Sequence, residues 1–134
     1  MLFRSFNAAI HYATSLETTL AEAVRVTRPG GHLVILDSPF YTSGQDGERM
    51  VAEKRAAAAR EWGPRAEALL ALPTIEYLTA DRLATASATH ALAWRRHRVR
   101  YPWWYECRPL VARLRGRRAP SRFDLWETVV PTPL

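Results

Sequence analysis

The sequence has 134 residues and a formal net charge of +6, with 48% hydrophobic and 24% charged residues. Such a chain is long enough to bury a core as one domain, and its composition argues against a disordered or fibrous protein. No apolar run reaches the ~18–20 residues of a membrane-spanning helix. The single cysteine, Cys107, excludes an internal disulfide and a Cys-based zinc site. We therefore expect a soluble protein of the cytoplasm without membrane association.

The positive charge is concentrated towards the C-terminus. Residues 1–92 carry 9 basic and 10 acidic side chains, whereas residues 93–134 carry 10 basic and 3 acidic ones. Such asymmetry is typical of a nucleic-acid or anionic-surface contact, or of an ordinary solvated surface. We favour the solvated surface, because a basic count alone rarely specifies a partner.

The N-terminal third predicts a strand, a helix and a second strand. Residues 2–12 read as a partial strand that runs into a loop. Thr14 to Glu17 has capping-box spacing and predicts a helix that ends at Arg28, since Pro29 cannot continue it. The apolar, β-branched run 32–37 predicts a strand that is covered on both faces.

The rest of the chain predicts helices followed by two strands. After a polar loop at 38–47 we expect helices at 48–62, 65–72, 81–92 and 102–114, with strands at 94–101 and 122–130. Thr79 is the expected N-cap of the 81–92 helix.

The strand expected at 94–101 has alternating side chains. Arg96, Arg98 and Arg100 share one face, which we interpret as a charged edge that discourages edge pairing. We expect Trp103 and Trp104 to cover the core, and Cys107 to be buried beside them.

Four segments together carry a resemblance to a known family. They are Asn7-Ala8-Ala9-Ile10-His11-Tyr12, the helix–Arg-Pro-Gly-Gly–strand unit at 22–35, Tyr77-Leu78-Thr79-Ala80-Asp81-Arg82-Leu83, and the basic region from Arg100 through Trp104 to Arg118 with Phe123-Asp124-Leu125 after it. In this order they resemble the C-terminal half of a class I S-adenosylmethionine-dependent methyltransferase of the small-molecule "type 11" group. The resemblance implies an α/β fold, a partial Rossmann-like sheet made of the family's fourth to seventh strands. It also implies helices on both faces and an antiparallel last strand.

The family's cofactor-binding signatures are missing from these residues. Such an enzyme needs a Gly-rich turn after its first strand and an acidic residue after its second, and neither occurs here. We therefore expect residues 1–134 to form a single domain, the C-terminal part of a methyltransferase domain without its Gly-rich half. The interrupted apolar run at 1–6 fits a start within a longer reading frame, or a truncation.

The resemblance also implies a site. Asn7 would face the cofactor, S-adenosylmethionine, or else cap the end of a strand, and Ala8 would face the cofactor beside it. His11 would be a general base for the acceptor, or else a polar loop residue, because histidine titrates near neutrality. Tyr12 would line the acceptor side, or else pack on the following helix.

Four residues after the second predicted strand are further candidates for substrate binding. Asp37 ends that strand, where ligands of open α/β sheets bind, and would meet the acceptor or satisfy loop amides. Ser38, Phe40 and Tyr41 would close the acceptor side, or else pack on the core. The histidines have no metal-ligand spacing, so we expect no metal.

The implied function is methyl transfer from S-adenosylmethionine to a small-molecule oxygen, nitrogen or carbon, with little activity by this chain alone. An alternative is a non-enzymatic remnant or interaction module. It would pair through its exposed first strand with a separately encoded N-terminal half or with itself, because an unpaired edge is a template for association. A basic nucleic-acid-binding module formed by residues 94–122 is a less favoured third possibility.

Overall fold

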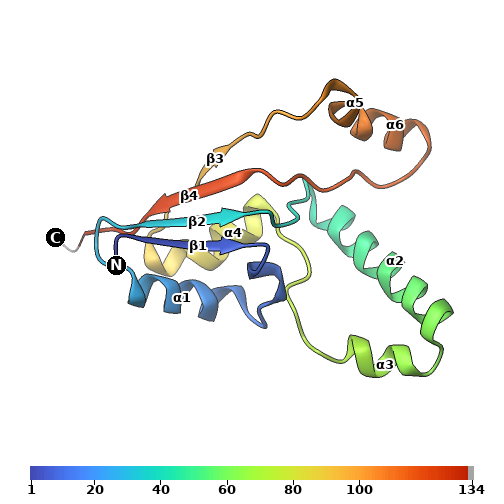
Figure 1. The fold of residues 1–134 in the computed structure, drawn as a ribbon, viewed down its shortest axis with the longest axis horizontal. Coiled ribbons are helices and arrows are strands. Elements are labelled where there is room, and N and C mark those ends of the chain that lie inside the picture. The colour runs from blue at the N-terminus through green and yellow to red at the C-terminus, as the bar shows by residue number, and fades with distance from the viewer. Residues whose placement is uncertain (133–134) are drawn as a thin grey trace.

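The computed structural model describes residues 1–132 and contains one mixed, open sheet of four strands flanked by helices (Figure 1). The strands are β1 (Phe3–Asn7), β2 (His32–Leu36), β3 (Arg95–His97) and β4 (Leu125–Val129), in the order β1-β2-β4-β3. β1 and β2 are parallel, and β4 is antiparallel to both β2 and β3. The α/β class and the antiparallel last strand are therefore confirmed.

Six α-helices and two 3-10 turns complete the described fold. They are η1 (Ile10–Tyr12), α1 (Leu16–Val26), α2 (Gly44–Trp62), α3 (Arg65–Leu70), α4 (Ala80–Ser87), η2 (Ala88–His90), α5 (Trp103–Glu106) and α6 (Arg108–Leu114). Within the described chain no helix combines the length and apolarity needed to cross a lipid bilayer.

Side-chain caps explain where three of the helices begin. Ser15, Ser43 and Thr79 each accept a hydrogen bond from a first-turn backbone N–H of α1, α2 and α4. The Thr79 cap was predicted. The start of α2 was predicted four residues too late, because Gly44 and Gly47 were read as loop residues although Ser43 caps the helix before them.

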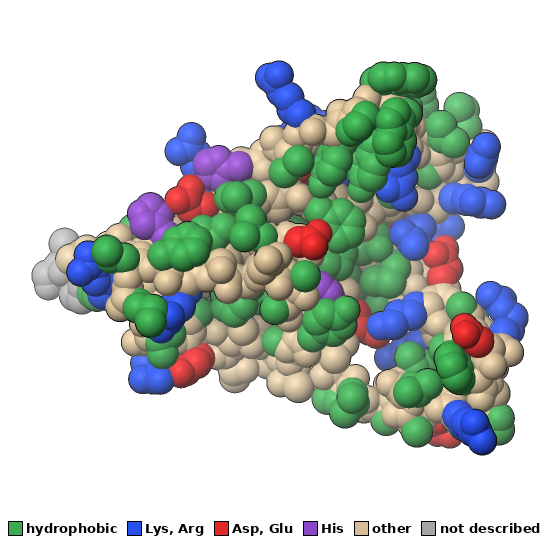
Figure 2. All heavy atoms as spheres, viewed as in Figure 1, with side chains coloured by type: hydrophobic (Ala, Val, Ile, Leu, Met, Phe, Trp, Pro, Cys, Tyr) green, Lys and Arg blue, Asp and Glu red, His purple; other side chains and the backbone are tan. Residues whose placement is uncertain are grey.

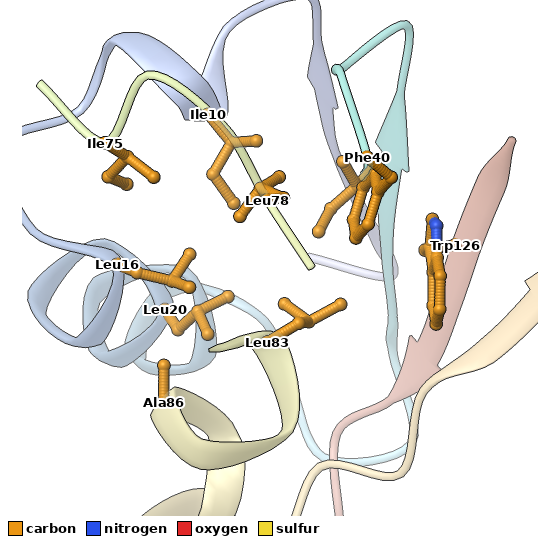
Figure 3. Packing of buried hydrophobic residues seen from close by; sticks show 10 residues of the cluster. Ile10, Leu16, Leu20, Phe40, Ile75, Leu78, Leu83, Ala86 and Trp126 are labelled. Carbon is orange, nitrogen blue, oxygen red and sulfur yellow. The ribbon is translucent and has the colours of Figure 1, made fainter. Parts of the chain in front are cut away.

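The main core lies between the sheet and the pair formed by α1 and α4 (Figure 3). Alternate residues of the strands point into it, and the register places Phe6, Ile35 and Trp126 side by side. Its buried members are Ile10, Leu16, Leu20, Ile35, Phe40, Ile75, Leu78, Leu83, Ala86 and Trp126. One face of the sheet is thus closed by helices.

The opposite face of the sheet is open, so the expectation of helices on both faces is wrong for residues 1–132. Phe3 and Val129 on this face are 53% and 48% exposed, and of its apolar residues only the central Val34 is buried. On the same face Glu127 accepts from His32 and His97 at 2.8 and 2.9 Å. β1 forms one edge of the described sheet, as the interaction-module alternative requires.

The C-terminal part differs most from expectation. Trp103 and Trp104 are 79% and 58% exposed and Cys107 is exposed, so their expected burial is wrong. Figure 1 gives the reason: α5 and α6 extend beyond the end of the sheet, away from α1 and α4. The predicted strand 94–101 is also shorter, because after His97 the chain turns and the Val99 N–H donates to Asp124.

Acid should weaken the contact between Arg122 and Glu106, which holds α5 to the segment before β4. The Arg122 guanidinium bonds both Glu106 oxygens at 3.0 and 3.2 Å, and this contact lowers the pKa of Glu106 from 4.5 to about 2. A depressed carboxyl pKa contributes stability that is complete above the unfolded value and is lost as pH falls through the folded value. We therefore expect the urea midpoint to fall between pH 4.5 and about 2.

Glu106→Gln is the control for this acid effect. The variant should be less stable than the parent at neutral pH, and its urea midpoint should fall less steeply with acid, since other carboxyl groups still titrate. Identical acid profiles for the two proteins would refute the assignment.

Candidate functional site

The carboxyl ends of the parallel strands β1 and β2 meet at one edge of the sheet. Asn7 ends β1, and the next residue, Ala8, donates its N–H to the carbonyl of Leu36 at the end of β2, at 3.0 Å. Asp37 is the residue that follows Leu36 in the chain. In open α/β sheets ligands bind beyond these strand ends, so the junction is where a site is expected.

Backbone strain gathers at this junction. The described chain has four non-glycine residues with positive φ, and three of them, Ala8, Asp37 and Glu76, lie here. Glu76 lies at the junction because its backbone N–H donates to the carbonyl of His11 at 2.9 Å. Left-handed backbone at non-glycine residues costs free energy and clusters at functional sites, so this junction is the best-supported candidate site in the fold.

His11 is the chemically most useful side chain of the junction. Its Nδ1 is buried and has no hydrogen-bond partner among the described residues, and its ring packs on Tyr12 with 4.2 Å between centroids. Burial lowers the pKa of His11, the charge of Asp37 opposes this, and the charge of Lys54 adds to it. The folded protein therefore favours the neutral imidazole, which is the form that accepts a proton.

The fold fixes His11 through its neighbours. Ile10 is 1% exposed and anchors η1 in the core, and the N–H of Ala13 donates to the carbonyl of Ile10 at 3.1 Å. The carbonyl of Ala13 in turn accepts from Ile75 at 2.9 Å. The 75–76 segment is thus tied to the middle residue of η1 and to the residue that follows η1, and His11 lies on a supported turn.

The predicted site residues divide into two groups. Asn7 and Ala8, together with Tyr12 at 69% exposure, lie at the surface of the junction. Ser38 is completely buried and bonds the Leu36 carbonyl at 3.2 Å, and Phe40 stacks on Trp126 in the core at 4.7 Å.

Tyr41 is also buried, at 6% exposure. Its ring meets the edge of Tyr77 at 5.9 Å, and its hydroxyl lies 3.4 Å from a nitrogen of Arg118. The side chains of Ser38, Phe40 and Tyr41 therefore support the loop after β2 from within, and of the candidates after that strand it is Asp37 whose charge acts on His11.

Two residues of the junction were missed from the sequence. Lys54 of α2 lies 3.5 Å from Glu76, and its charge acts on His11. Lys54 is the only lysine among 19 basic residues, a compositional signal that singles it out. Glu76 had no such signal, because only the tertiary pairing of its segment with η1 brings it here. Within residues 1–132, the junction included, no cluster of three or more histidine, cysteine or carboxylate side chains is placed to hold a metal ion.

Comparison with protein-family models gives no match, and comparison with curated proteins and with solved structures gives none either.

The titration of His11 should report the environment of the junction. We expect its NMR-detected midpoint to lie below the ordinary value of 6.5, because burial disfavours the imidazolium. Asp37→Asn should lower the midpoint further and Lys54→Met should raise it, since each change removes one neighbouring charge. A midpoint above 6.5, or shifts of the opposite sign in the variants, would refute the geometry.

Proposed function

We propose that this chain supplies the acceptor side of a class I S-adenosylmethionine-dependent methyltransferase that acts on a small molecule. The observation that carries the proposal is a histidine, with its Nδ1 buried and unpartnered among the described residues, at the strained carboxyl-end junction of two parallel strands. The antiparallel last strand, β4, supports it, because the resemblance predicts an antiparallel last strand.

The residues present fit one side of the methyl donor. The exposed Asn7 amide offers hydrogen-bond donors and an acceptor at the end of β1, and the small side chain of Ala8 leaves its backbone open to approach. No Gly-rich turn follows a strand in these 134 residues. The remainder of the donor would therefore be held by a Gly-rich half-domain placed against the exposed edge of β1.

When bound, S-adenosylmethionine supplies an electrophilic methyl group. The residues of this chain contribute placement and proton transfer. Nδ1 of His11 is buried, so Nε2 is the nitrogen through which an acceptor is reached, and it takes the proton that an acceptor hydroxyl or amine loses. The Asp37 carboxylate favours the imidazolium that forms, because its charge raises the pKa of His11. The exposed ring of Tyr12 offers a flat surface on which an acceptor packs.

Equilibrium dialysis with labelled S-adenosylmethionine tests the proposal. A half-site should bind the donor weakly, with a dissociation constant in the millimolar range, and the chain alone should form no S-adenosylhomocysteine. Sub-micromolar binding would contradict the half-site account, and a lack of binding at several millimolar donor would contradict the proposal itself.

An interaction module is the second candidate, favoured by the exposed β1 edge and by the open sheet face with Phe3 and Val129. Such a surface associates with a further strand or with a second copy. Sedimentation analysis separates the two proposals: a stable dimer without donor binding favours the module, and a monomer with weak donor binding favours the methyltransferase half.

A further inference from the structure

A hollow in the surface lies away from the strand junction, between α2 and the arm formed by α5 and α6. Figure 2 shows hydrophobic side chains gathered over the arm, arginine side chains beside them, and a hollowed surface towards α2. The hollow is a pocket of about 690 Å³, within the range of about 300–1,000 Å³ that holds small ligands. We call it the arm pocket; its lining is Glu53, Trp104, Arg108, Val111, Ala112, Arg115, Arg117, Arg118 and Pro120.

The arm pocket carries an excess of positive charge. Four guanidinium groups face a single carboxylate, Glu53. Outside the pocket, three arginines of this region form ion pairs, Arg96 with Asp124 and both Arg98 and Arg122 with Glu106. Arg115 and Arg117 form no ion pair with any residue in the range 1–132. Their charge is therefore available to a ligand.

Part of this lining is held in place before any ligand arrives. Arg118 donates from Nε to Glu53 at 2.7 Å and lies 3.4 Å from the Tyr41 hydroxyl. The following residue, Ala119, donates its N–H to Asp46 at 3.1 Å, which ties the connection to the first turn of α2. A guanidinium fixed in this way presents its remaining N–H groups at low entropic cost.

The end of α6 places the two free arginines on either side of a tight turn. Gly116 has φ of +61°, a conformation that glycine adopts without penalty. The Arg117 N–H then donates to the carbonyl of Ala112 at 2.8 Å, which closes the helix in a Schellman-type turn. Arg115 and Arg117 therefore flank the turn, and both line the pocket.

The pocket also has an aromatic wall. Trp104 is 58% exposed although it is large and apolar, and it lines the pocket together with Val111 and Pro120. An exposed tryptophan beside unpaired arginines offers a stacking surface next to oxyanion donors.

From these observations we propose that the arm pocket binds a small aromatic molecule that carries a phosphate group. Arginine forks match the geometry of phosphate oxygens, and a dianion suits a surplus of positive charge better than a carboxylate does. A flat ring occupies the wall formed by Trp104. The arm pocket is separate from the strand junction, so its test is independent of the methyltransferase proposal.

Calorimetric titration of the full chain with phenyl phosphate, inorganic phosphate and benzoate tests the ligand class. Phenyl phosphate should bind saturably and more tightly than either of the others, because only it carries both the ring and the dianion. Tighter binding of benzoate would overturn the phosphate assignment. Stronger competition by a single-stranded oligonucleotide than by phenyl phosphate would replace the small ligand with nucleic acid.

Matched variants test the location. Arg115→Gln/Arg117→Gln should weaken phenyl phosphate binding by about tenfold or more, since two charge-assisted contacts are lost. Arg55→Gln/Arg60→Gln removes the same charge from exposed positions of α2 outside the pocket and should leave binding unchanged. If both double variants weakened phenyl phosphate binding equally, the ligand would be held by the general positive charge of the protein, and the assignment of the arm pocket would be overturned.

Trp104→Ala tests the aromatic wall. Its binding of inorganic phosphate should stay at the parent's level, while the preference for phenyl phosphate over phosphate should disappear. A preference that persists in this variant would overturn the proposed role of the wall.

Discussion

Gly47→Ala is expected to destabilise the protein by about 2 kcal/mol in urea denaturation. A Cβ built on Gly47 would lie 2.2 Å from the Tyr77 ring, far inside van der Waals contact. Overpacking of this kind costs about 3 kcal/mol at its upper range, and the helix propensity gained by alanine returns about 1 kcal/mol. The cost of the clash therefore exceeds the gain in helix propensity, because the Tyr77 ring cannot move away freely. Tyr41 packs against this ring, and the Arg82 guanidinium lies 4.6 Å from its centroid.

Gly44→Ala is the matched control in the same helix. A Cβ at Gly44 meets nothing within 4 Å, so this change should be neutral or should stabilise by up to about 1 kcal/mol. The double variant Gly47→Ala/Tyr77→Ala should be less destabilised than the two single effects added together, because the ring that clashes is gone. Strict additivity, or equal effects of the two glycine variants, would contradict the packing of α2 on Tyr77.

Asp124→Ala is expected to cost about 3 kcal/mol of unfolding free energy, since it removes the buried acceptor that joins β3, the 98–101 segment and the start of β4. Asp124 is 1% exposed and accepts from Arg96 Nε at 2.8 Å, from the Val99 N–H at 3.0 Å and from Arg122 Nε at 3.4 Å. Burial opposes the charge of Asp124, yet these hydrogen bonds together hold its pKa below the ordinary value. The loss will be measured by chemical denaturation at neutral pH.

Arg98→Ala provides the comparison for Asp124. Its ion pair with Glu106 spans 3.4 Å and is largely exposed, so removing it should change stability by less than about 1 kcal/mol. Asp124→Asn keeps the side-chain volume and one oxygen acceptor, so its loss of unfolding free energy should lie between those of Asp124→Ala and Arg98→Ala. If Asp124→Ala were no more costly than Arg98→Ala, the buried network would not be holding the C-terminal strands together.

The local elements with strong sequence signals were predictable. The Arg-Pro-Gly-Gly turn stops α1 and allows β2 to start at His32, and the Thr79 hydroxyl marks the start of α4. These features depend on backbone chemistry within a few residues, which sequence patterns express directly.

The failures share a physical cause, which is that burial depends on where an element lies in the fold. Trp103 and Trp104 were expected in the core because they are large and apolar, but the arm that carries them projects past the sheet. The alternation after Arg95 was read as a long strand, whereas the buried Asp124 carboxylate binds the Val99 N–H and redirects the chain.

The candidate site was predictable in part for the same reason. Asn7, His11 and Asp37 follow strands or belong to a motif, so the sequence places them near the strand ends. Lys54 and Glu76 reach the junction only because α2 and the 75–76 segment fold over it. Because these segments lie far apart in the chain, no local sequence pattern predicts the contact between them.

Amide NMR of the full chain during titration with S-adenosylhomocysteine tests the central proposal most directly, because it locates weak binding residue by residue. We predict saturable shifts in the millimolar range confined to the strand junction, at Asn7, Ala8, His11, Tyr12 and Asp37, with Arg115 and Arg117 of the arm pocket unmoved. Shifts centred elsewhere, or none at several millimolar ligand, would contradict the assignment of this junction as half of a methyl-transfer site.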